Sequence, residues 1–413
     1  LTRADTLTLG SSGGPITQDN TSVEYYATIY ALAESPHDEG TLWVGSDDGL
    51  LHVTRDGGGS WTDITPGPRL LPSDAMINSI EADPARPGGL YVAATRYKVD
   101  DFAPYLLRTE DYGATWQRID DGIEAPAFTR VIRADPMRPG LLYTGTERGM
   151  YVSFDDGELW QPFQLDLPIV PVTDLAVRQG ELVVATQGRG FYVLDDLTPL
   201  YQLQPAVASA PMWLFRPKPT YRVDGYRQSV TRGAGTNPES GVVIHYRLAE
   251  ALPDSAEAAL KIIDRSGEVV QTFTPDDDDF ELATEAGMNR VVWGRRYPDA
   301  SRFDGMIFWG GGLNGPQAVP GDYTARLVVD GDSVQVPFEI LLDPRSSATP
   351  EDLQAQFEFL REVRDKVTEV NESVEQVRDL RTQIRAFLAR LPEGAVGVDT
   401  VKAAGNALVE RMT

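Results

Sequence analysis

The sequence predicts a mainly β protein: repeated small sheets come first, then a second β domain, then a long helix towards the C-terminal end. Three observations support this prediction. A short pattern, Ser/Thr-x-Asp-x-Gly-x-x-Trp, recurs three times before residue 161. Short apolar runs separated by Gly and Pro turns fill most of the chain up to residue 343. From residue 349, apolar residues instead recur every three or four positions, which is the helical period.

The recurring pattern predicts hairpin turns. Its copies run from Thr54 to Trp61, from Thr109 to Trp116 and from Ser153 to Trp160, each after a short apolar run. We call them boxes 1 to 3. Asp in a tight turn accepts backbone N–H bonds, Gly takes a positive φ, and Trp buries a large ring. We therefore expect structural rather than catalytic roles for Asp56, Gly58, Trp61, Asp111, Gly113, Trp116, Asp155, Gly157 and Trp160.

The repeat is longer than the box. Residues 29–64, 77–119, 129–163 and 172–194 each contain strand-like runs separated by turns. Four strands per unit at a period of roughly 40 to 55 residues is typical of β-propeller blades. The fourth unit ends without the Gly and the Trp of the box. We expect residues 1–198 to form about four blades, preceded by a short strand over Thr6–Leu9.

One loop breaks the repeat and is the main candidate for a binding site. Between their second and third strands, three units have tight turns, whereas the second unit inserts residues 96–105. Insertions in a repeat often mark its binding face. A packing role for the inserted loop is the alternative. The candidate binding residues on these loops are Arg96, Tyr97, Asp100, Asp101, Tyr105, Arg148 and Arg189.

A linker and a second β domain follow the blades. Residues 199–240 are rich in Pro and Gly and predict an extended linker, in which Met212–Phe215 packs on a neighbouring domain. Residues 241–343 have the short strands and turns of a β-sandwich. The expected strands are Val242–Leu248, Ala259–Ile263, Val269–Phe273, Asn289–Trp293, Gly321–Val329 and Ser333–Leu342. The acidic run Asp276–Asp279 lacks the alternating ligands and Gly of a calcium loop, which favours a solvated turn.

Residues 349–413 predict a helical hairpin or coiled-coil tail. Thr349, Pro350 and Asp352 form a start signal with a capping residue, a first-turn Pro and an acid three positions after the cap. The apolar stripe that begins at Leu360 has heptad spacing and would extend over about 60 Å of helix. Such a stripe needs a partner, which is a second helix folding back, the β-sandwich or another protein.

Composition argues against several function classes. The 413 residues include no Cys, which excludes disulfides and thiolate metal sites. The net charge of −25, from 62 acidic and 37 basic residues, argues against nucleic-acid binding. No apolar run is long enough to cross a bilayer. Only three His are present, each isolated in the sequence, so we expect no metal and no cofactor.

The three boxes resemble the Asp-box, or bacterial neuraminidase repeat, of sialidases, some glucanases, the sortilin ectodomain and an assembly factor of photosystem II. The order of the whole chain is similar to that of large secreted bacterial proteins identified as Asp-box or sortilin-like glycosyl hydrolases. The resemblance implies an immunoglobulin-like or FlgD-like module over residues 241–343 and a periplasmic or secreted location. It also implies that this chain is the C-terminal part of a longer protein; a closed four-bladed propeller is the alternative.

Two functions follow as expectations. A glycoside hydrolase needs two carboxylates about 5 to 10 Å apart, and sialidases of the Asp-box family also use an Arg cluster and a Tyr. No motif ties such residues together here, and we name no catalytic residue. We favour an extracytoplasmic, non-catalytic binding or scaffold subunit of a larger, membrane-associated assembly, with another protein or its own N-terminal propeller half as partner. Glycan binding without hydrolysis, through Trp43, Tyr97 or Tyr105, is a third hypothesis.

Overall fold

A computed structural model describes residues 1–2, 27–223, 235–307, 309–393 and 396–412. The strand expected over Thr6–Leu9 lies outside the described residues. The chain divides into two compact units, Leu1–Tyr201 and Gln202–Thr413.

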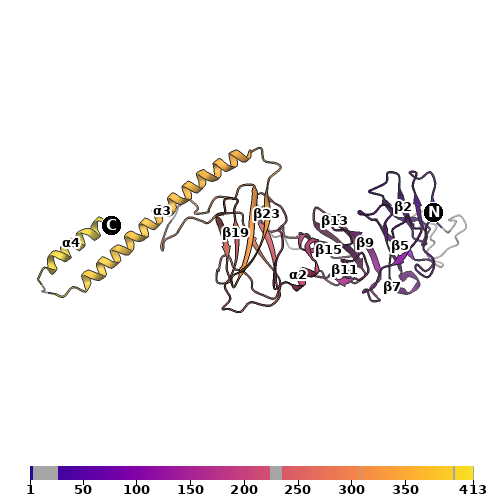
Figure 1. Ribbon diagram of the computed structural model, residues 1–413, viewed down its shortest axis with the longest axis horizontal. Coiled ribbons are helices and arrows are strands. Elements are labelled where there is room, and N and C mark those ends of the chain that lie inside the picture. The colour runs from indigo at the N-terminus through magenta and orange to yellow at the C-terminus, as the bar shows by residue number, and fades with distance from the viewer. Residues whose placement is uncertain (3–26, 224–234, 308, 394–395, 413) are drawn as a thin grey trace. The chain divides into compact units, whose positions relative to one another are not determined.

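The first unit is mainly β and contains four small antiparallel sheets, each made of consecutive strands (Figure 1). We call these sheets blades 1 to 4. Blade 1 comprises β1 (Ile29–Glu34), β2 (Leu42–Ser46), β3 (Leu51–Thr54) and β4 (Thr62–Asp63). Blade 2 comprises β5 (Met76–Ala82), β6 (Leu90–Arg96), β7 (Asp101–Thr109) and β8 (Gln117–Arg118), with the 3₁₀ helix η1 (Tyr97–Val99) between β6 and β7. Blade 3 comprises β9 (Thr129–Ala134), β10 (Leu142–Thr146), β11 (Gly149–Ser153) and β12 (Gln161–Pro162). Blade 4 has only β13 (Val172–Arg178), β14 (Glu181–Thr186) and β15 (Gly190–Leu194) among the described residues.

The blades share one register as well as one strand order. The first strand of every blade carries an extra residue opposite its second strand, which is a β-bulge. The bulged residues are Tyr30, Asn78, Arg130 and Thr173. Because the bulge falls at the same point in each blade, equivalent residues of the first and second strands pair with each other in all four blades. Residues of different blades can therefore be compared directly by the position that they pair with.

Apolar side chains fill the space between successive blades. Leu51 and Ile64 of blade 1 pack with Ile77 and Leu90 of blade 2, and all four are buried. Similar clusters join blade 2 to blade 3 and blade 3 to blade 4. The second strands of blades 1 to 3 are buried on both faces, which explains their continuous apolar runs in the sequence. Each interior blade is thus stabilised by the two blades beside it.

The described part of the second unit contains two sheets, one short helix and two longer helices (Figure 1). The smaller sheet has the order β16 (Met212–Leu214), β18 (Val242–Leu248), β21 (Gly287–Trp293). The larger has the order β17 (Thr220–Arg222), β23 (Asp332–Leu342), β22 (Gly321–Val329), β19 (Ala258–Ile263), β20 (Val269–Phe273). The six strands expected after residue 241 are present, with ends that differ by two residues at most. Both sheets contribute to one buried core that includes Tyr246, Leu260, Trp293 and Phe338.

The segment interpreted as a linker, residues 199–240, contains more regular structure than expected. Its described part includes most of α1 (Thr198–Gln202), then α2 (Pro205–Ser209), β16 and β17. Met212–Leu214 pairs with β18, so this apolar stretch belongs to a sheet of the second unit. β17 pairs in parallel with β23, far along the chain. Strands of three residues leave no periodic pattern in a sequence, which is why they were not expected.

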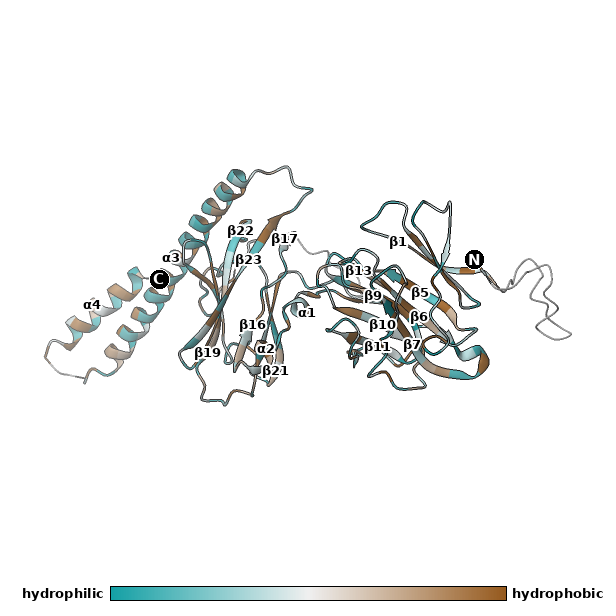
Figure 2. Ribbon diagram, turned by 45° about the vertical axis from the view of Figure 1, so that its right-hand side comes forward, coloured by the Kyte–Doolittle hydropathy of each residue, from teal (hydrophilic) through white to brown (hydrophobic). Residues whose placement is uncertain are grey.

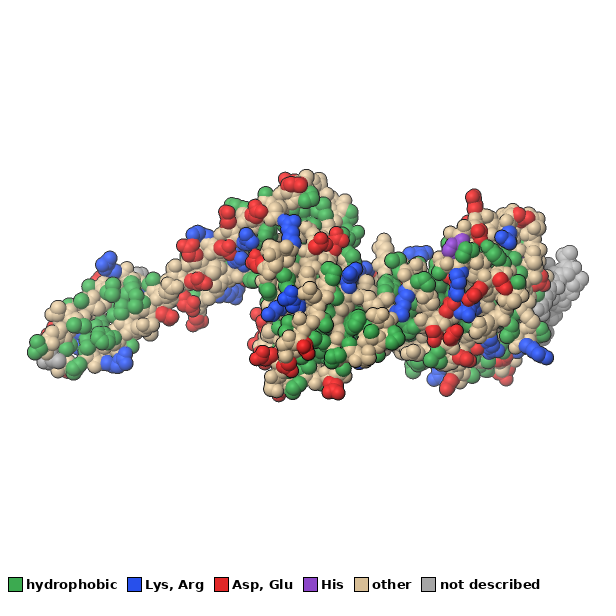
Figure 3. Space-filling view, viewed as in Figure 1, with side chains coloured by type: hydrophobic (Ala, Val, Ile, Leu, Met, Phe, Trp, Pro, Cys, Tyr) green, Lys and Arg blue, Asp and Glu red, His purple; other side chains and the backbone are tan. Residues whose placement is uncertain are grey.

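The long helix α3 (Pro350–Ala389) contacts two other parts of the second unit, but most residues of its apolar stripe are exposed. Near its start, the Phe357 ring lies 4.7 Å from the ring of Tyr297 in the second unit's β structure, and Asn371 Nδ2 donates to Ser301 O at 2.6 Å. Near its end, Leu388 packs against Gly405 of α4 (Val398–Arg411), which folds back along it. Apolar residues remain visible on both helices (Figures 2 and 3). None of the described helices is long and apolar enough to cross a membrane.

Candidate functional site

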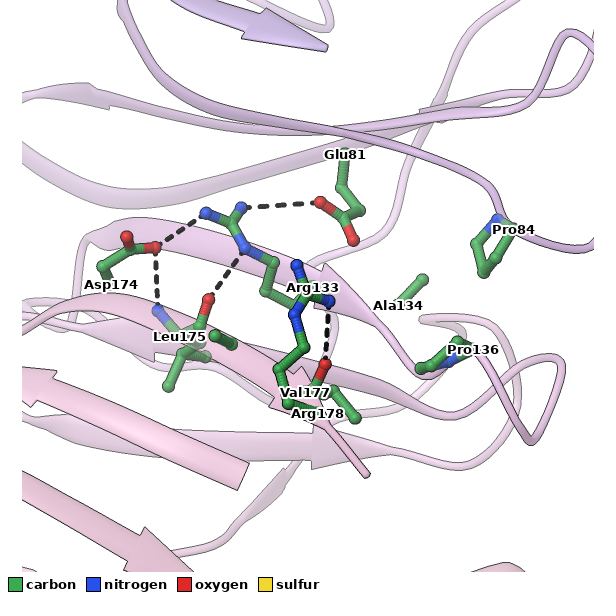
Figure 4. A pocket seen from close by; sticks show the side chains of 10 residues that line it. Glu81, Pro84, Arg133, Ala134, Pro136, Asp174, Leu175, Val177 and Arg178 are labelled. Atoms are coloured by element: carbon green, nitrogen blue, oxygen red, sulfur yellow. Dashed lines mark hydrogen bonds and ion pairs between the residues drawn. The ribbon is translucent and has the colours of Figure 1, made fainter. Parts of the chain in front are cut away.

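The first strands of blades 2, 3 and 4 place four charged residues around one pocket of about 270 Å³ (Figure 4). Glu81 comes from β5, Arg133 from β9, and Asp174 and Arg178 from β13. These residues are up to 97 positions apart in the sequence and meet because the blades stack in order. None of the four was among the residues expected from the sequence. The signal that could have found them is that the first strands of three successive repeats each contain a charged residue next to apolar ones.

Arg133 holds the pocket together. Its Nη2 donates to Asp174 Oδ1 at 2.7 Å, and its Nη1 donates to Ser79 Oγ at 2.7 Å. Its Nε donates to the carbonyl oxygen of Leu175 at 2.9 Å. Nη1 also lies 3.7 Å from a carboxylate oxygen of Glu81. One guanidinium therefore joins three blades, and its donors are already engaged within the protein.

Glu81 is the unusual group of this pocket. Burial raises the pKa of its carboxyl to about 7, against the opposing effects of the nearby Arg133 and Arg178. The group therefore exchanges its proton near neutral pH. Asp174, the other carboxylate, is paired with Arg133. The arrangement provides a partly exposed salt-bridge network, in which the Asp174 side chain is 62% exposed and Glu81 can be protonated. Such a network joins strands, and it offers no group placed to attack a substrate.

The inserted loop of blade 2 is a closed hairpin. Arg96 forms an ion pair with Asp101 at 2.6 Å, and the hydroxyl of Tyr105 donates to the same carboxylate at 2.7 Å. Asp100 has a left-handed φ of 62° at the end of η1, where it turns the chain into β7. Tyr105 is buried and is covered by the guanidinium of Arg118 at 4.5 Å. Four of the expected binding residues thus contribute to the loop's own structure.

Tyr97 is one of several exposed residues of this loop. Its ring is partly exposed and stacks on Phe128 at 5.2 Å. The guanidinium of Arg130 lies over both rings and pairs with Glu147 at 2.6 Å. Trp43, which was considered with Tyr97 and Tyr105 for glycan stacking, is buried at 1% exposure. Of these three aromatic residues, only Tyr97 presents part of its ring to a ligand.

Arg148 and Arg189 lie on exposed turns of blades 3 and 4. Neither forms an ion pair with another described residue. The described contacts do not bring them together with the inserted loop into one site. The acidic run Asp276–Asp279 also forms a turn, in which Asp277 accepts backbone N–H bonds from Asp279 and Phe280 at 2.9 Å. No group of three metal-binding side chains occurs within the described ranges.

The boxes form similar turns held by their Asp side chains. In box 2, Asp111 accepts from the backbone N–H of Thr115 at 2.8 Å and from its hydroxyl at 2.6 Å. The hydroxyl of Thr109 donates to the same carboxylate and accepts the N–H of Gly113. These donors lower the pKa of Asp111. In box 3, Leu159 replaces the second hydroxyl, so Asp155 accepts only the backbone N–H at that position.

The Trp of boxes 2 and 3 connects its blade to the blade before it. Trp116 Nε1 donates to Ile64 O at 2.8 Å, and Trp160 Nε1 donates to Ile119 O at 2.5 Å. Both acceptors directly follow the fourth strand of the preceding blade. Box 2 also places Gly113 where a Cβ atom would lie 2.5 Å from Ile64. The box therefore shapes its own turn and seals the contact with a neighbouring blade.

The outer face of blade 4 has exposed apolar side chains at positions that are buried in the other blades. Phe191 pairs with Ala185 in blade 4. The equivalent pairs in blades 1, 2 and 3 are Leu51 with Gly45, Leu106 with Ala93, and Met150 with Gly145. The first residue of each of these pairs is almost fully buried by the next blade, whereas Phe191 is 78% exposed. Val193, two residues further along β15, is half exposed. Blade 1 also exposes an apolar residue at a position that is buried elsewhere. Leu32 of β1 is 64% exposed, whereas its counterpart in blade 3, Ile132, is fully buried.

The geometry can be compared with known proteins. No family model matches the chain, and no curated protein matches its sequence. Among solved structures, YCF48 bound to a D1 peptide is similar at 24% identity and a TM-score of 0.32, over 41% of this chain and 52% of that one. The GH74 xyloglucanase from Xanthomonas campestris is similar at 18% identity and a TM-score of 0.33, over 75% of this chain and 45% of that one. The chain thus spans about half the length of these structures, and the likeness concerns the β fold alone.

Proposed function

We propose that the chain is a non-catalytic binding or scaffold subunit whose first unit docks onto another protein through the outer face of blade 4. The observation that carries this proposal is the 78% exposure of Phe191, at a position that is fully buried in blades 1 and 2. The register shows that this position normally faces another sheet. The resemblance of the boxes to those of secreted proteins extends the proposal to an extracytoplasmic location.

The exposed residues of blade 4 favour burial against a partner. Phe191 and Val193 alternate along β15, so their side chains lie on one face of the strand. Burying a side chain of this size contributes about 1.5 to 3 kcal/mol. Adjacent apolar side chains exposed on a sheet face are typical of an interaction surface. A partner that covers both residues would extend the packing that already joins the interior blades.

The charged residues of the first unit support a structural role. Arg133 joins three blades through the contacts described above. On another side, Arg86 pairs with Asp83 at 2.6 Å and with Asp156 of blade 3 at 2.7 Å. The hydroxyl of Tyr91 also donates to Asp83 at 3.1 Å, and burial raises the pKa of this Tyr. These groups stabilise a rigid platform on which a surface can be displayed.

A second apolar surface lies in the other unit. Val370, Val374 and Val377 of α3 line a groove of about 440 Å³ together with Met412 beyond α4. At this groove, Arg378 of α3 donates to Asp304 O at 2.7 Å and lies over the Phe303 ring at 4.5 Å. Hydrophobic side chains gather over this helical pair in Figure 3. Two separate apolar surfaces on one chain are suited to a scaffold with more than one contact.

A capture experiment with matched variants tests the proposal. The full chain would be immobilised in three forms: unchanged, with Phe191→Asp and Val193→Asp, and with Met137→Asp as control. Met137 is 70% exposed on a turn of blade 3, so the control adds the same charge at an equally exposed place. We expect proteins of the native source to be retained by the unchanged chain and the control and lost by the double variant.

Two results would contradict the proposal. The first is a set of retained proteins that is identical for all three forms, which would mean that the face of blade 4 takes no part in binding. The second is release of sugar from a glycan panel by the purified chain, which would favour the hydrolase hypothesis. Circular dichroism of each form would confirm that the exposed substitutions leave the fold intact.

A further inference from the structure

Blade 4 has an open edge where the other blades have a fourth strand. In blade 1, the N–H of Ile64 donates to Leu51 O at 2.9 Å, and the same bond joins Ile119 to Leu106 and Phe163 to Met150. The counterpart of these acceptors in blade 4 is Phe191. No strand pairs with the outer side of β15 among the residues that the structure describes. The register directs the N–H and C=O groups of Phe191 and Val193 to this open side.

The same region contains an empty counterpart of a Trp site. Trp160 of blade 3 is buried in a cluster with Leu106, Ile119, Ile123, Leu142 and Tyr151. The register places Met150, Phe163, Leu167, Leu182 and Tyr192 at the equivalent positions one blade later. All five line a cavity of about 150 Å³ between blades 3 and 4. The cavity therefore lies where a fourth-strand Trp of blade 4 would pack, and we call it the indole socket.

Backbone acceptors at the socket match those that hold Trp160. Trp160 bonds through Nε1 to Ile119 O and through its N–H to Asp121 O at 2.8 Å. The equivalent acceptors are the carbonyl groups of Phe163 and Leu165. Neither receives a hydrogen bond from another described residue. Both residues line the socket, so apolar lining and acceptors occur at the same place.

We infer that β15 and the indole socket bind an extended segment of a partner protein with the pattern Trp-x-x-apolar, added as an antiparallel fourth strand. The occupant is read from the chain's own fourth strands, which begin after Trp61, Trp116 and Trp160 and are followed by Ile64, Ile119 and Phe163. The Trp fills the socket, and the apolar residue lies on the other face beside Phe191. Strand addition to a sheet edge with a pocket for an alternate side chain is a recurring mode of peptide recognition. This inference rests on the proposed docking function of blade 4.

A peptide that copies the chain's own strand tests the inference. The probe is a fluorescein-labelled peptide with the sequence of residues 114–121, which contains Trp116 and Ile119. Binding to the full chain would be followed by fluorescence anisotropy and, up to millimolar concentration, by NMR. We expect saturable binding of one peptide per chain. Replacing the peptide's Trp by Ala, or methylating the backbone nitrogen of its Ile, should weaken binding by about tenfold or more.

Variants of the protein distinguish the outcomes. Phe191→Asp should weaken binding of the unmodified peptide, and Met137→Asp should leave it unchanged. Equal binding of the Trp and Ala peptides would overturn the inference, as would the absence of binding at millimolar concentration. If the peptide fails while the capture experiment still depends on Phe191 and Val193, blade 4 docks in another way and the proposed function stands. If both fail, the proposed function is wrong as well.

Discussion

Trp160 Nε1 donates a hydrogen bond to the carbonyl oxygen of Ile119 across the boundary between blades 2 and 3. Trp116 makes the same bond to Ile64 one boundary earlier. The Trp of boxes 2 and 3 is therefore a contact between blades as well as a part of its own hairpin. Blade 4 lacks a box, and no fourth strand pairs with it among the residues that the structure describes, so the indole socket has no Trp there.

Trp160→Phe should destabilise the first unit by about 1 to 3 kcal/mol, because it leaves the carbonyl of Ile119 buried without its donor. Trp61→Phe is the matched control, since the Nε1 of Trp61 makes no hydrogen bond with the described residues and its ring is partly exposed. Urea unfolding followed by circular dichroism would measure both. Equal losses for the two variants would contradict the inter-blade role of the indole.

Gly113→Ala should cost more stability than Gly188→Ala. Both residues have a positive φ, of 86° and 82°, so both variants carry the same left-handed backbone penalty. An added Cβ at Gly113 would lie 2.5 Å from Ile64, whereas nothing lies within 4 Å at Gly188. We expect the difference in the free energy of unfolding to be about 1 to 3 kcal/mol. Equal melting temperatures would show that Ile64 moves aside freely.

Leu159→Thr should stabilise box 3 by about 0.5 kcal/mol, because it restores the hydroxyl that donates to the box Asp in the other two copies. Leu159 is half exposed, so little apolar burial is lost. The reverse change in box 2, Thr115→Leu, should destabilise it by a similar amount. The two variants would be compared by chemical denaturation, and changes of the same sign would contradict this account of the box.

Glu81 should make the stability of the first unit fall as pH rises. Its pKa is raised from 4.5 to about 7 in the folded protein, so between these values the folded state holds a proton that the unfolded state has lost. Stability from this group is therefore full below pH 4.5 and declines up to about pH 7. The gain in unfolding free energy from Glu81→Gln should grow over that range and level off above it. A gain that is constant from pH 5 to 8 would refute the shifted pKa.

The sequence alone predicts the features that repeat along the chain or follow a regular apolar pattern. The hairpin position of the boxes follows from Asp and Gly at fixed places, and the strands of residues 242–342 follow from apolar runs between turns. The start of α3 follows from Thr349 and Asp352, which form a capping box in the structure. These signals are local, so a single chain displays them without any knowledge of its packing.

The candidate site could not be predicted from the sequence alone. Glu81, Arg133 and Asp174 meet only because three blades stack, and a charge in one strand does not show which distant charge it faces. The exposure of Phe191 was hidden for a similar reason, since Leu51 and Met150 in the same place look equally apolar in the sequence. A comparison of this position across the four blades shows that Phe191 is exposed where the equivalent residues are buried.

Amide hydrogen exchange of the full chain tests the uncovered edge of blade 4 most directly. The account predicts that the segment 190–194 exchanges much faster than 149–153, the equivalent strand of blade 3, and slows when the Trp-x-x-apolar peptide is added. The segment 149–153 should change little, because its own fourth strand already covers it. If 190–194 is as protected as 149–153 in the free chain, the edge of blade 4 is already covered and the central claim is wrong.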